Sequence, residues 1–458
     1  MRNLSVIFLT LWISVAVGRT DYRVRTASQL ATLTLKAGDR VILEPGDWID
    51  QELVFRGKGT QAEPIRLTVD IPGNVVLTGN SSLVIDGNWL VVDGLSFKGE
   101  NTLSHHGIRF SEASSNCRLT NTAVIDYSNS DRRIRNSWIV VLGKKNRVDH
   151  CYTEGKTNNG PTLHVGPTAD EKVYNGPHEH RIDHNYFAHR PPFGRNGAES
   201  IVVGSGNWYE KSFHTLVEFN VFERCDGESE VISVKATNNT IRHNLFYESK
   251  GMLYLRHGDA NVVYGNYFIG NNIKGSGGVH IIGKHQRVYD NYFYGLTNGV
   301  IVRNGWEKSW IYIQVDDLQL ANNTFISCEQ TLVLGWDKDA RATLPAVNSL
   351  VSSNLFVSKE EPIVWTNEND QKDNRTLVFE SNASIPLENG DAAVLKARNG
   401  ATWTKNEIGI YGYDRVDSAQ AAGAPPMSDS LKDLFKAIKV GPAWMKLEKH
   451  FSIKQPEM

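Results

Sequence analysis

Short hydrophobic runs that alternate with polar residues recur at a regular distance through the middle of the chain. Typical runs are Val262-Val263-Tyr264 and Val288-Tyr289, each followed closely by the tripeptide Asn-x-Phe. The asparagines of seven such tripeptides are separated by 35, 24, 22, 25, 32 and 31 residues. They are Asn185, Asn220, Asn244, Asn266, Asn291, Asn323 and Asn354. A repeat of this length predicts a solenoid.

The runs are too short for helices and are rich in β-branched and aromatic residues, so each turn is predicted to consist of strands. Residues two apart in a strand share a face, which places each Asn and its following Phe on one side. Stacked turns would align the phenylalanines into a core column and the asparagines into a hydrogen-bonded ladder. The predicted fold is therefore all-β, a single-domain right-handed parallel β-helix. Helical repeats, the alternative, need longer runs of 3.6-residue period that the sequence lacks.

Both ends of a solenoid need caps, because an open end exposes strand edges. Thr26 to Ala37 suits a short N-terminal cap. Ser428 to Ile438 has hydrophobic residues at helical spacing and predicts a capping helix within a C-terminal cap region of about 371–458.

The composition is typical of a globular protein rather than of a small disulfide-rich domain or a membrane protein. It has 458 residues, 40% hydrophobic and 22% charged, with a net charge of −2. Its 38 Asn and 39 Gly agree with many tight corners. No nucleic-acid partner is expected, and any polyanion must be bound by a local groove or a metal rather than by global charge.

The N-terminus has the form of a secretory signal peptide. Residues 1–18 combine Arg2, an apolar run from Leu4 to Val17 and a small-residue exit. We expect a secreted or periplasmic protein whose solenoid domain occupies residues 19–458, with a buried N-terminal strand as the alternative for 1–18. No other segment approaches the length of a membrane-spanning helix.

The four cysteines, Cys117, Cys151, Cys225 and Cys328, include no CxxC pair and so lack a zinc signature. We expect each to be a small buried apolar residue, with one disulfide left open.

The most unusual polar stretch contains Glu228 and Glu230. Two apart on a strand, both carboxylates project from one face, and this repulsion favours a hard divalent ion such as Ca²⁺ between them. Asn196 lies 24 residues before Asn220, close to one turn, and could supply a neutral oxygen to the same ion. A solvated glutamate pair on an outer strand is the alternative.

Two cations follow on consecutive turns. Lys235 is nine positions before Asn244, and Arg256 is ten before Asn266, so they are predicted to occupy nearly the same corner on adjacent turns. The sequence shows no obvious acidic partner for either. The pair is therefore expected to face an anionic ligand beside the metal.

Four central motifs resemble polysaccharide lyase family 6, which contains the alginate lyases and chondroitinase B. They are Asn-Gly-Ala-Glu at 196–199, Gly-Glu-Ser-Glu-Val-Ile-Ser-x-Lys at 227–235, Leu-Arg-His-Gly at 255–258 and Gly-Gly-Val-His-Ile-Ile-Gly at 277–283. Further likeness at 38–43, 91–97 and 440–444 extends the resemblance over nearly the whole mature chain. The resemblance implies a parallel β-helix and a lyase acting on alginate.

The resemblance also assigns roles to individual residues. It implies that Asn196, Glu228 and Glu230 hold Ca²⁺, that Lys235 is the Brønsted base, and that Arg256 acts on the acid side. Such an enzyme removes the C5 proton of a uronate and expels the 4-oxygen by β-elimination, leaving an unsaturated uronate end. Ca²⁺ would neutralise the substrate carboxylate.

The substrate-binding candidates are Tyr254, His257, Arg303 and His280, the last of which stands where related sequences often carry Arg. A guanidinium does not readily lose a proton, so Arg256 is expected to stabilise the departing oxygen. Water, His257 and Tyr254 remain open as proton donors. The alternatives are a structural role for His257 and an ordinary exposed charge for Arg303.

Three other functions compete with an alginate lyase. A dermatan sulfate lyase of the chondroitinase B type should need an additional sulfate-binding cluster. A hydrolase would work with two carboxylates and leave Lys235 and Arg256 unexplained. A non-catalytic polysaccharide-binding β-helix would have no need of the complete set of site residues.

Overall fold

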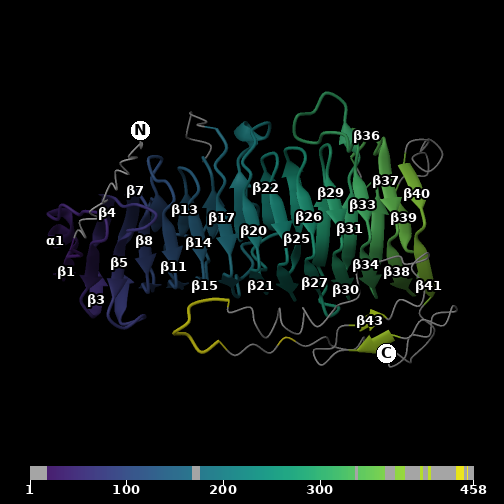
Figure 1. Ribbon diagram of the computed structural model, residues 1–458. Coiled ribbons are helices and arrows are strands. Elements are labelled where there is room, and N and C mark those ends of the chain that lie inside the picture. Colours follow the sequence, from purple (N-terminus) through teal and green to yellow (C-terminus); the bar gives the residue numbers. More distant parts are fainter. Residues whose placement is uncertain are drawn as a thin grey trace, which may run out of the picture.

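Three parallel sheets run side by side along an elongated body (Figure 1). The computed structural model describes residues 18–167, 176–335, 339–366, 377–386, 403–405, 411–413, 440–447 and 451. Each turn adds one strand to sheet A, one to sheet B and one to sheet C before the chain returns to sheet A. The protein is thus a parallel β-solenoid, and the predicted fold class is confirmed.

The strands of the described chain fall into the following sets. Sheet A has 14: β1 (Asp21–Val24), β2 (Arg40–Leu43), β5 (Ile65–Val69), β8 (Leu90–Asp93), β11 (Arg118–Thr120), β14 (Arg147–Asp149), β17 (Arg181–Asp183), β20 (Leu216–Glu218), β23 (Thr240–Arg242), β26 (Val262–Tyr264), β29 (Arg287–Tyr289), β33 (Gln319–Ala321), β37 (Ser349–Ser352) and β40 (Leu377–Glu380). Sheet B has 13: β3 (Gly46–Ile49), β6 (Val75–Thr78), β9 (Ser96–Lys98), β12 (Ala123–Ile125), β15 (Tyr152–Glu154), β18 (Tyr186–Phe187), β21 (Val221–Glu223), β24 (Leu245–Tyr247), β27 (Tyr267–Ile269), β30 (Tyr292–Tyr294), β34 (Thr324–Ile326), β38 (Leu355–Ser358) and β41 (Ala383–Pro386). Sheet C has 12: β4 (Glu52–Lys58), β7 (Ser82–Asn88), β10 (Ile108–Phe110), β13 (Ile139–Val141), β16 (Leu163–Val165), β19 (Ile201–Gly204), β22 (Glu230–Lys235), β25 (Gly251–His257), β28 (Ser276–Ile281), β31 (Asn298–Val302), β35 (Gln330–Leu334) and β39 (Ile363–Trp365).

Further short elements lie outside these sheets. Two antiparallel pairs form outside them, β32 (Gly305–Trp306) with β36 (Ala342–Leu344), and β42 (Trp403–Lys405) with β43 (Tyr411–Tyr413). The described helical elements are α1 (Ala27–Ala31) and the 3-10 turn η1 (Gly206–Trp208). None of the described helices is long and apolar enough to cross a membrane.

Both predicted columns are present in the core. Each Asn of the repeat donates its Nδ2 to the Oδ1 of the next Asn at 2.9–3.0 Å, from Asn185 through Asn354. The phenylalanines stack between Phe187 and Phe356, with ring centroids 4.5–5.3 Å apart. Asn382 extends the ladder by one rung at 3.0 Å. The sequence motif missed it because Ser384 stands opposite Phe356.

Replacing Asn266 by alanine is expected to lower the free energy of unfolding by about 3 kcal/mol. Its buried Oδ1 accepts from the backbone and side-chain amides of Asn244, both at 3.0 Å, and these donors would lose their partner. Urea unfolding followed by circular dichroism measures the change. The exposed Asn207 provides the control, and equal stabilities of the two alanine variants would contradict the role of the ladder.

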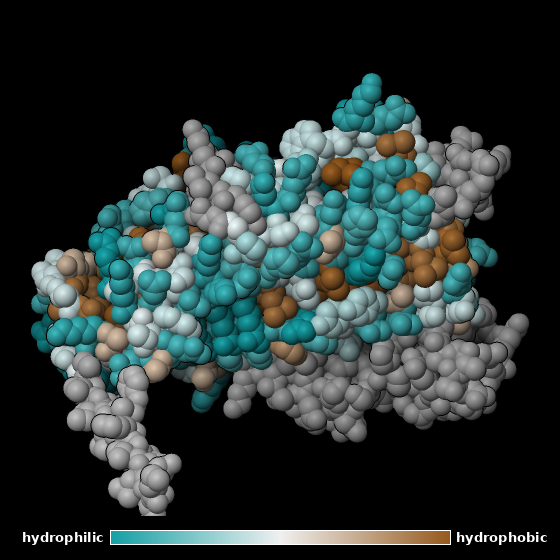
Figure 2. Space-filling view, turned by 45° about the horizontal axis from the view of Figure 1, so that its top comes forward, coloured by the Kyte–Doolittle hydropathy of each residue, from teal (hydrophilic) through white to brown (hydrophobic). Residues whose placement is uncertain are grey.

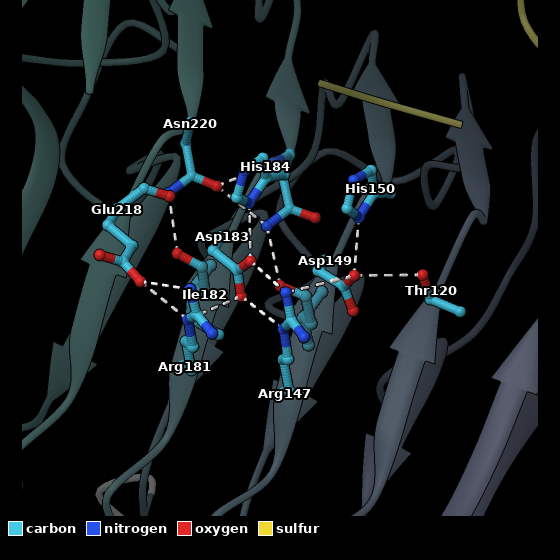
Figure 3. A network of polar contacts seen from close by, with 12 residues as sticks. Thr120, Arg147, Asp149, His150, Arg181, Ile182, Asp183, His184, Glu218 and Asn220 are labelled. Atoms are coloured by element: carbon cyan, nitrogen blue, oxygen red, sulfur yellow. Dashed lines mark hydrogen bonds and ion pairs between the residues drawn. The ribbon is translucent and has the colours of Figure 1, made fainter. Parts of the chain in front are cut away.

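A ladder of ion pairs follows the strands of sheet A (Figure 3). Each buried carboxylate pairs with an arginine of a neighbouring turn, as Arg147 Nε does with Asp183 Oδ1 at 2.7 Å. The carboxylates are Asp149, Asp183 and Glu218, and the arginines are Arg118, Arg147, Arg181 and Arg242. Burial opposes ionisation of Asp149, but Arg118, His150 and Arg147 together outweigh burial and lower the pKa of Asp149 to about 2. Asp149 therefore stays ionised at neutral pH.

The N-terminal end of the core is covered as predicted. Thr26 caps α1 through its hydroxyl, which accepts from the Gln29 amide at 3.2 Å, and the helix buries Leu30. Leu33 and Leu35 pack against the same core. The proposed signal peptide, residues 1–18, and the predicted helix Ser428–Ile438 lie essentially outside the described residues.

The described C-terminal segment 440–447 runs back along the body rather than over its end (Figure 1). Gly441 donates its amide to the His184 carbonyl at 2.9 Å, and Trp444 donates its indole N–H to Asn121 O at 2.9 Å. Val440 and Leu447 pack on the apolar outer face of sheet B. This segment therefore covers a flank of the solenoid.

The visible surface is mostly hydrophilic, with scattered hydrophobic spots (Figure 2). All four cysteines are buried free thiols. Their predicted role as small buried residues is confirmed, and the possible disulfide is absent.

Candidate active site

The candidate site lies on the outer face of sheet C, at the ends of β22 and β25. Alternation along β22 buries Ile232 and Val234 in the core and turns Lys235 outward. In β25 it buries Leu255 and turns Arg256 outward. Both cationic side chains keep about a fifth of their surface exposed, 20% and 19%.

The two cations lie on adjacent turns, as predicted, but with a one-residue irregularity. Val234 pairs with Leu255, and Lys235 then pairs with His257, so Arg256 is the extra residue of a bulge. Bulges re-aim side chains and often lie next to active sites. The sequence shows the same offset of one position, because Lys235 lies nine residues before Asn244 whereas Arg256 lies ten before Asn266.

Each cation has an acidic partner, so the expectation that neither has one is wrong. Lys235 Nζ lies 3.2 Å from Glu199 Oε1, and Arg256 Nε lies 3.3 Å from Glu230 Oε1. The sequence pattern did not reveal Glu199 as a partner, because it precedes Lys235 by 36 residues and lies on the preceding turn. Its signal was its position just after Asn196, at the end of Asn-Gly-Ala-Glu.

Three glutamates, Glu199, Glu228 and Glu230, form one electrostatically coupled group beside the cations. The side chains of Glu199 and Glu230 are only 1% and 7% exposed. Burial and repulsion from Glu199 raise the pKa of Glu228 to about 7, and burial raises the pKa of Glu230. Without a further cation, this group therefore resists full ionisation.

Some carboxylate oxygens of this group are available to bind a hard cation. Glu199 Oε2 and Glu230 Oε2 are buried and accept no hydrogen bond from the described residues. Glu228 Oε1 accepts from the amides of Gly197 and Ala198, both at 3.0 Å, which ties it to the turn that begins at Asn196. Such oxygens suit Ca²⁺. The side chains as placed do not converge, and the described residues contain no ready-made cluster of three or more His, Cys, Asp or Glu ligands.

Asn196 is exposed next to this group. Its neighbour Gly197 has φ +104°, and a Cβ there would lie 2.4 Å from Asn159 Oδ1, so the turn needs glycine. The Asn196 side chain forms no hydrogen bond with the three glutamates. Its predicted role as a ligand stays a prediction.

A buried arginine supports the turn from below. Arg190 is 3% exposed and donates to the Glu199 carbonyl, to Gly160 O at 2.8 Å and to Thr162 Oγ1 at 3.1 Å. Backbone carbonyls thus compensate its charge, and it holds the backbone of Glu199 in place.

The two histidines of the site are neutral near pH 7. Burial, reinforced by Arg256 and Lys235, lowers the pKa of His257 to about 3, which argues against this ring as a charged acid. Burial also lowers the pKa of His280 to about 3. His280 is 1% exposed and stacks on Tyr254, with ring centroids 4.3 Å apart. This position argues against the predicted direct substrate contact of His280.

Tyr254 and Arg303 do reach the site. Tyr254 lies on the same face as Arg256, and burial followed by the charge of Glu230 raises its pKa, so its hydroxyl keeps its proton. Arg303 follows β31 and stacks on Tyr312, with its guanidinium carbon 4.0 Å from the ring centroid. Arg256 contacts the same ring at 4.9 Å and its hydroxyl at 3.3 Å. Tyr312, which the sequence pattern did not reveal as a site residue, therefore joins the two arginines.

Comparison with known proteins identifies the family. The family model described as Chondroitinase B matches residues 25–383. The chain belongs to this family. No curated protein matches it.

Solved structures place the chain among polysaccharide lyases of family 6. It is similar to the PL6 family alginate lyase AlyGC, with 32% identity, a TM-score of 0.81 and 94% of this chain covered. It spans 60% of the AlyGC chain. A mannuronic acid specific family 6 lyase from human gut microbiota shows 30% identity over 93% of this chain and 97% of that one, with a TM-score of 0.75. A PL6 family lyase from Pseudopedobacter saltans shows 25% identity over 93% and 99%, with a TM-score of 0.74.

Proposed function

We propose that this protein is a Ca²⁺-dependent alginate lyase that cleaves by β-elimination. One observation supports this most strongly: Lys235 and Arg256 project from adjacent turns beside the carboxylates of Glu199, Glu228 and Glu230, the first and last of which are buried. A base, a fixed cation and a set of acidic oxygens are the groups that such an elimination needs. Membership of the family gives the same reaction class.

Lys235 is the proposed base for the C5 proton of the uronate. A lysine must be neutral to accept a proton, and Lys235 Nζ lies 3.2 Å from Glu199 Oε1. A metal ion bound beside Glu199 would compete with Lys235 for this carboxylate. We therefore assign Glu199 to the positioning of Lys235.

Arg256 is proposed to stabilise the oxygen that leaves C4. Its guanidinium is fixed between Glu230 at 3.3 Å and Tyr312 at 3.3 Å, so it can present its remaining N–H groups without reorganisation. The protonated hydroxyl of Tyr254 on the same face is the proposed proton donor to that oxygen.

Asn196, Glu228 and Glu230 are proposed to hold the metal ion, and Glu199 adds a buried Oε2 that accepts no hydrogen bond from the described residues. When bound, Ca²⁺ would supply neutralisation of the substrate carboxylate and stabilisation of the developing enolate. Burial has already removed the free oxygens of Glu199 and Glu230 from water.

A dermatan sulfate lyase is the second candidate, because the matching family model is described as Chondroitinase B. The similarity at 32% and 30% identity to lyases described as acting on alginate and mannuronic acid favours alginate.

The test offers purified protein mannuronate-rich, guluronate-rich and alternating alginate, and dermatan sulfate, and follows the ultraviolet absorbance of the unsaturated product. Absorbance is expected from at least one alginate. If only dermatan sulfate gives the absorbance, the substrate is dermatan sulfate rather than alginate. No absorbance from any polymer, with calcium present, would overturn the lyase assignment.

A further inference from the structure

A hollow of about 540 Å³ lies beside the candidate site, outside the three sheets. Its walls come from residues 306–311 and from 340–343, next to the β32–β36 pair. In Figure 1 this region rises above the strands near β36. Nothing in the proposed elimination requires it.

Aromatic rings form the walls of the hollow. Trp310 is 52% exposed, which is unusual for so large an aromatic side chain. Its ring is held from the sides by His257 and Tyr209, at centroid distances of 5.9 and 6.1 Å. Trp306 packs on Tyr312 at 4.2 Å. The exposed indole is thus fixed in position although it faces solvent.

Charged groups stand at the rim. The Arg341 guanidinium carbon lies 3.8 Å from the centre of the Trp306 ring, and Asp339 Oδ1 accepts from Arg341 Nε at 2.8 Å. Lys308 and Glu307 both line the hollow and are exposed, so the rim carries charges of both signs. An apolar aromatic wall with a few fixed polar groups is typical of ligand sites.

The hollow is continuous with the candidate site. Tyr312 contacts Arg256 on one side and Trp306 on the other. Arg303, on the same tyrosine, belongs to the turn two strands beyond Arg256, about 10 Å along the solenoid axis at the usual strand spacing. A polymer held at Lys235 and Arg256 can therefore reach Trp310.

We propose that this hollow is a distal subsite for a further uronate residue of the polymer bound at Lys235 and Arg256. Trp310 stacks on the face of the sugar ring, and Lys308 and Arg341 attract its carboxylate. The identity of the polymer rests on the proposed function, whereas the position of the subsite rests on the hollow. The subsite makes the enzyme prefer chains long enough to fill it.

The test compares uronate oligosaccharides of two to six residues, of one block type at a time. For cleavage, the ratio of kcat/KM on the hexasaccharide to that on the shortest cleaved chain is expected to fall about tenfold in Trp310→Ala. Trp310→Phe is expected to restore part of the ratio. Phe379→Ala, an exposed aromatic on β40, is the control and keeps the wild-type ratio.

Binding is measured separately by titration calorimetry in the inactive Lys235→Ala background. The affinity for the oligosaccharides is expected to rise at the chain length that first fills the hollow. Trp310→Ala is expected to remove that rise. If wild-type protein cleaves alginate but Trp310→Ala keeps both the ratio and the rise, the subsite is overturned and the proposed function stands. If no polymer is cleaved but the rise depends on Trp310, the proposed function fails and the subsite stands. An equal loss for all chain lengths also contradicts the subsite.

Discussion

Replacing Lys235 by alanine is expected to lower kcat on alginate by about 10³-fold with little change in KM. The side chain projects beside Arg256 from the neighbouring turn, and its amine lies 3.2 Å from Glu199. Its removal leaves the substrate-binding groups in place but takes away the acceptor of the C5 proton. Initial rates of ultraviolet absorbance over a range of alginate concentrations separate kcat from KM.

Lys250 provides a matched control for this experiment. Its side chain is 50% exposed and lies 3.7 Å from Asp226, outside the group that surrounds Lys235. Lys250→Ala is expected to retain wild-type kcat. Added methylamine is expected to restore part of the activity of Lys235→Ala, because a small amine can replace the missing base. Wild-type activity in Lys235→Ala would rule out this residue as the base.

Calcium is expected to stabilise the wild-type protein against unfolding and to be required for activity. At a free concentration of roughly 100 times Kd, binding to the folded state adds about 2.7 kcal/mol to the free energy of unfolding. Glu228→Gln is expected to lose most of this stabilisation. The amide oxygen can still accept from Gly197 and Ala198, but the negative charge is gone.

Urea unfolding with calcium or with a chelator measures this effect independently of catalysis. Glu329→Gln, an exposed glutamate beyond the site, serves as the control and is expected to respond to calcium as the wild type does. Equal calcium stabilisation of Glu228→Gln and wild type would remove Glu228 from the metal site. Full activity after thorough chelation would reject the metal while leaving the lyase assignment intact.

Much of the site followed from the period of the repeat. Each turn of the repeat contains one ladder asparagine. Counting back from Asn244 and Asn266 therefore placed Lys235 and Arg256 on adjacent turns. The observed strand register agrees with this within one residue. The same count could not show that Glu199, one turn earlier, faces Lys235. The two residues belong to different parts of unequal turns, and only the folded path of the loop between them sets their distance.

The burial of individual side chains also could not be predicted from the sequence. His280 was a substrate-binding candidate because related sequences often carry Arg at its position, yet it stacks on Tyr254 and is only 1% exposed. Similarly, the role of Tyr312 depends on a loop that folds back over sheet C. Long side chains and loops decide such contacts, and no strand periodicity records them.

The sequence by itself determined the solenoid, its Asn ladder and Phe column, and the strand face that presents Lys235 and Arg256. It could do so because a parallel β-solenoid repeats local rules, and each turn packs only on its neighbours. The tertiary structure alone decided the acidic partners of both cations, the burial of the carboxylates and the aromatic hollow at Trp310. These features depend on loops of unequal length between the strands, whose paths are set by packing rather than by the repeat.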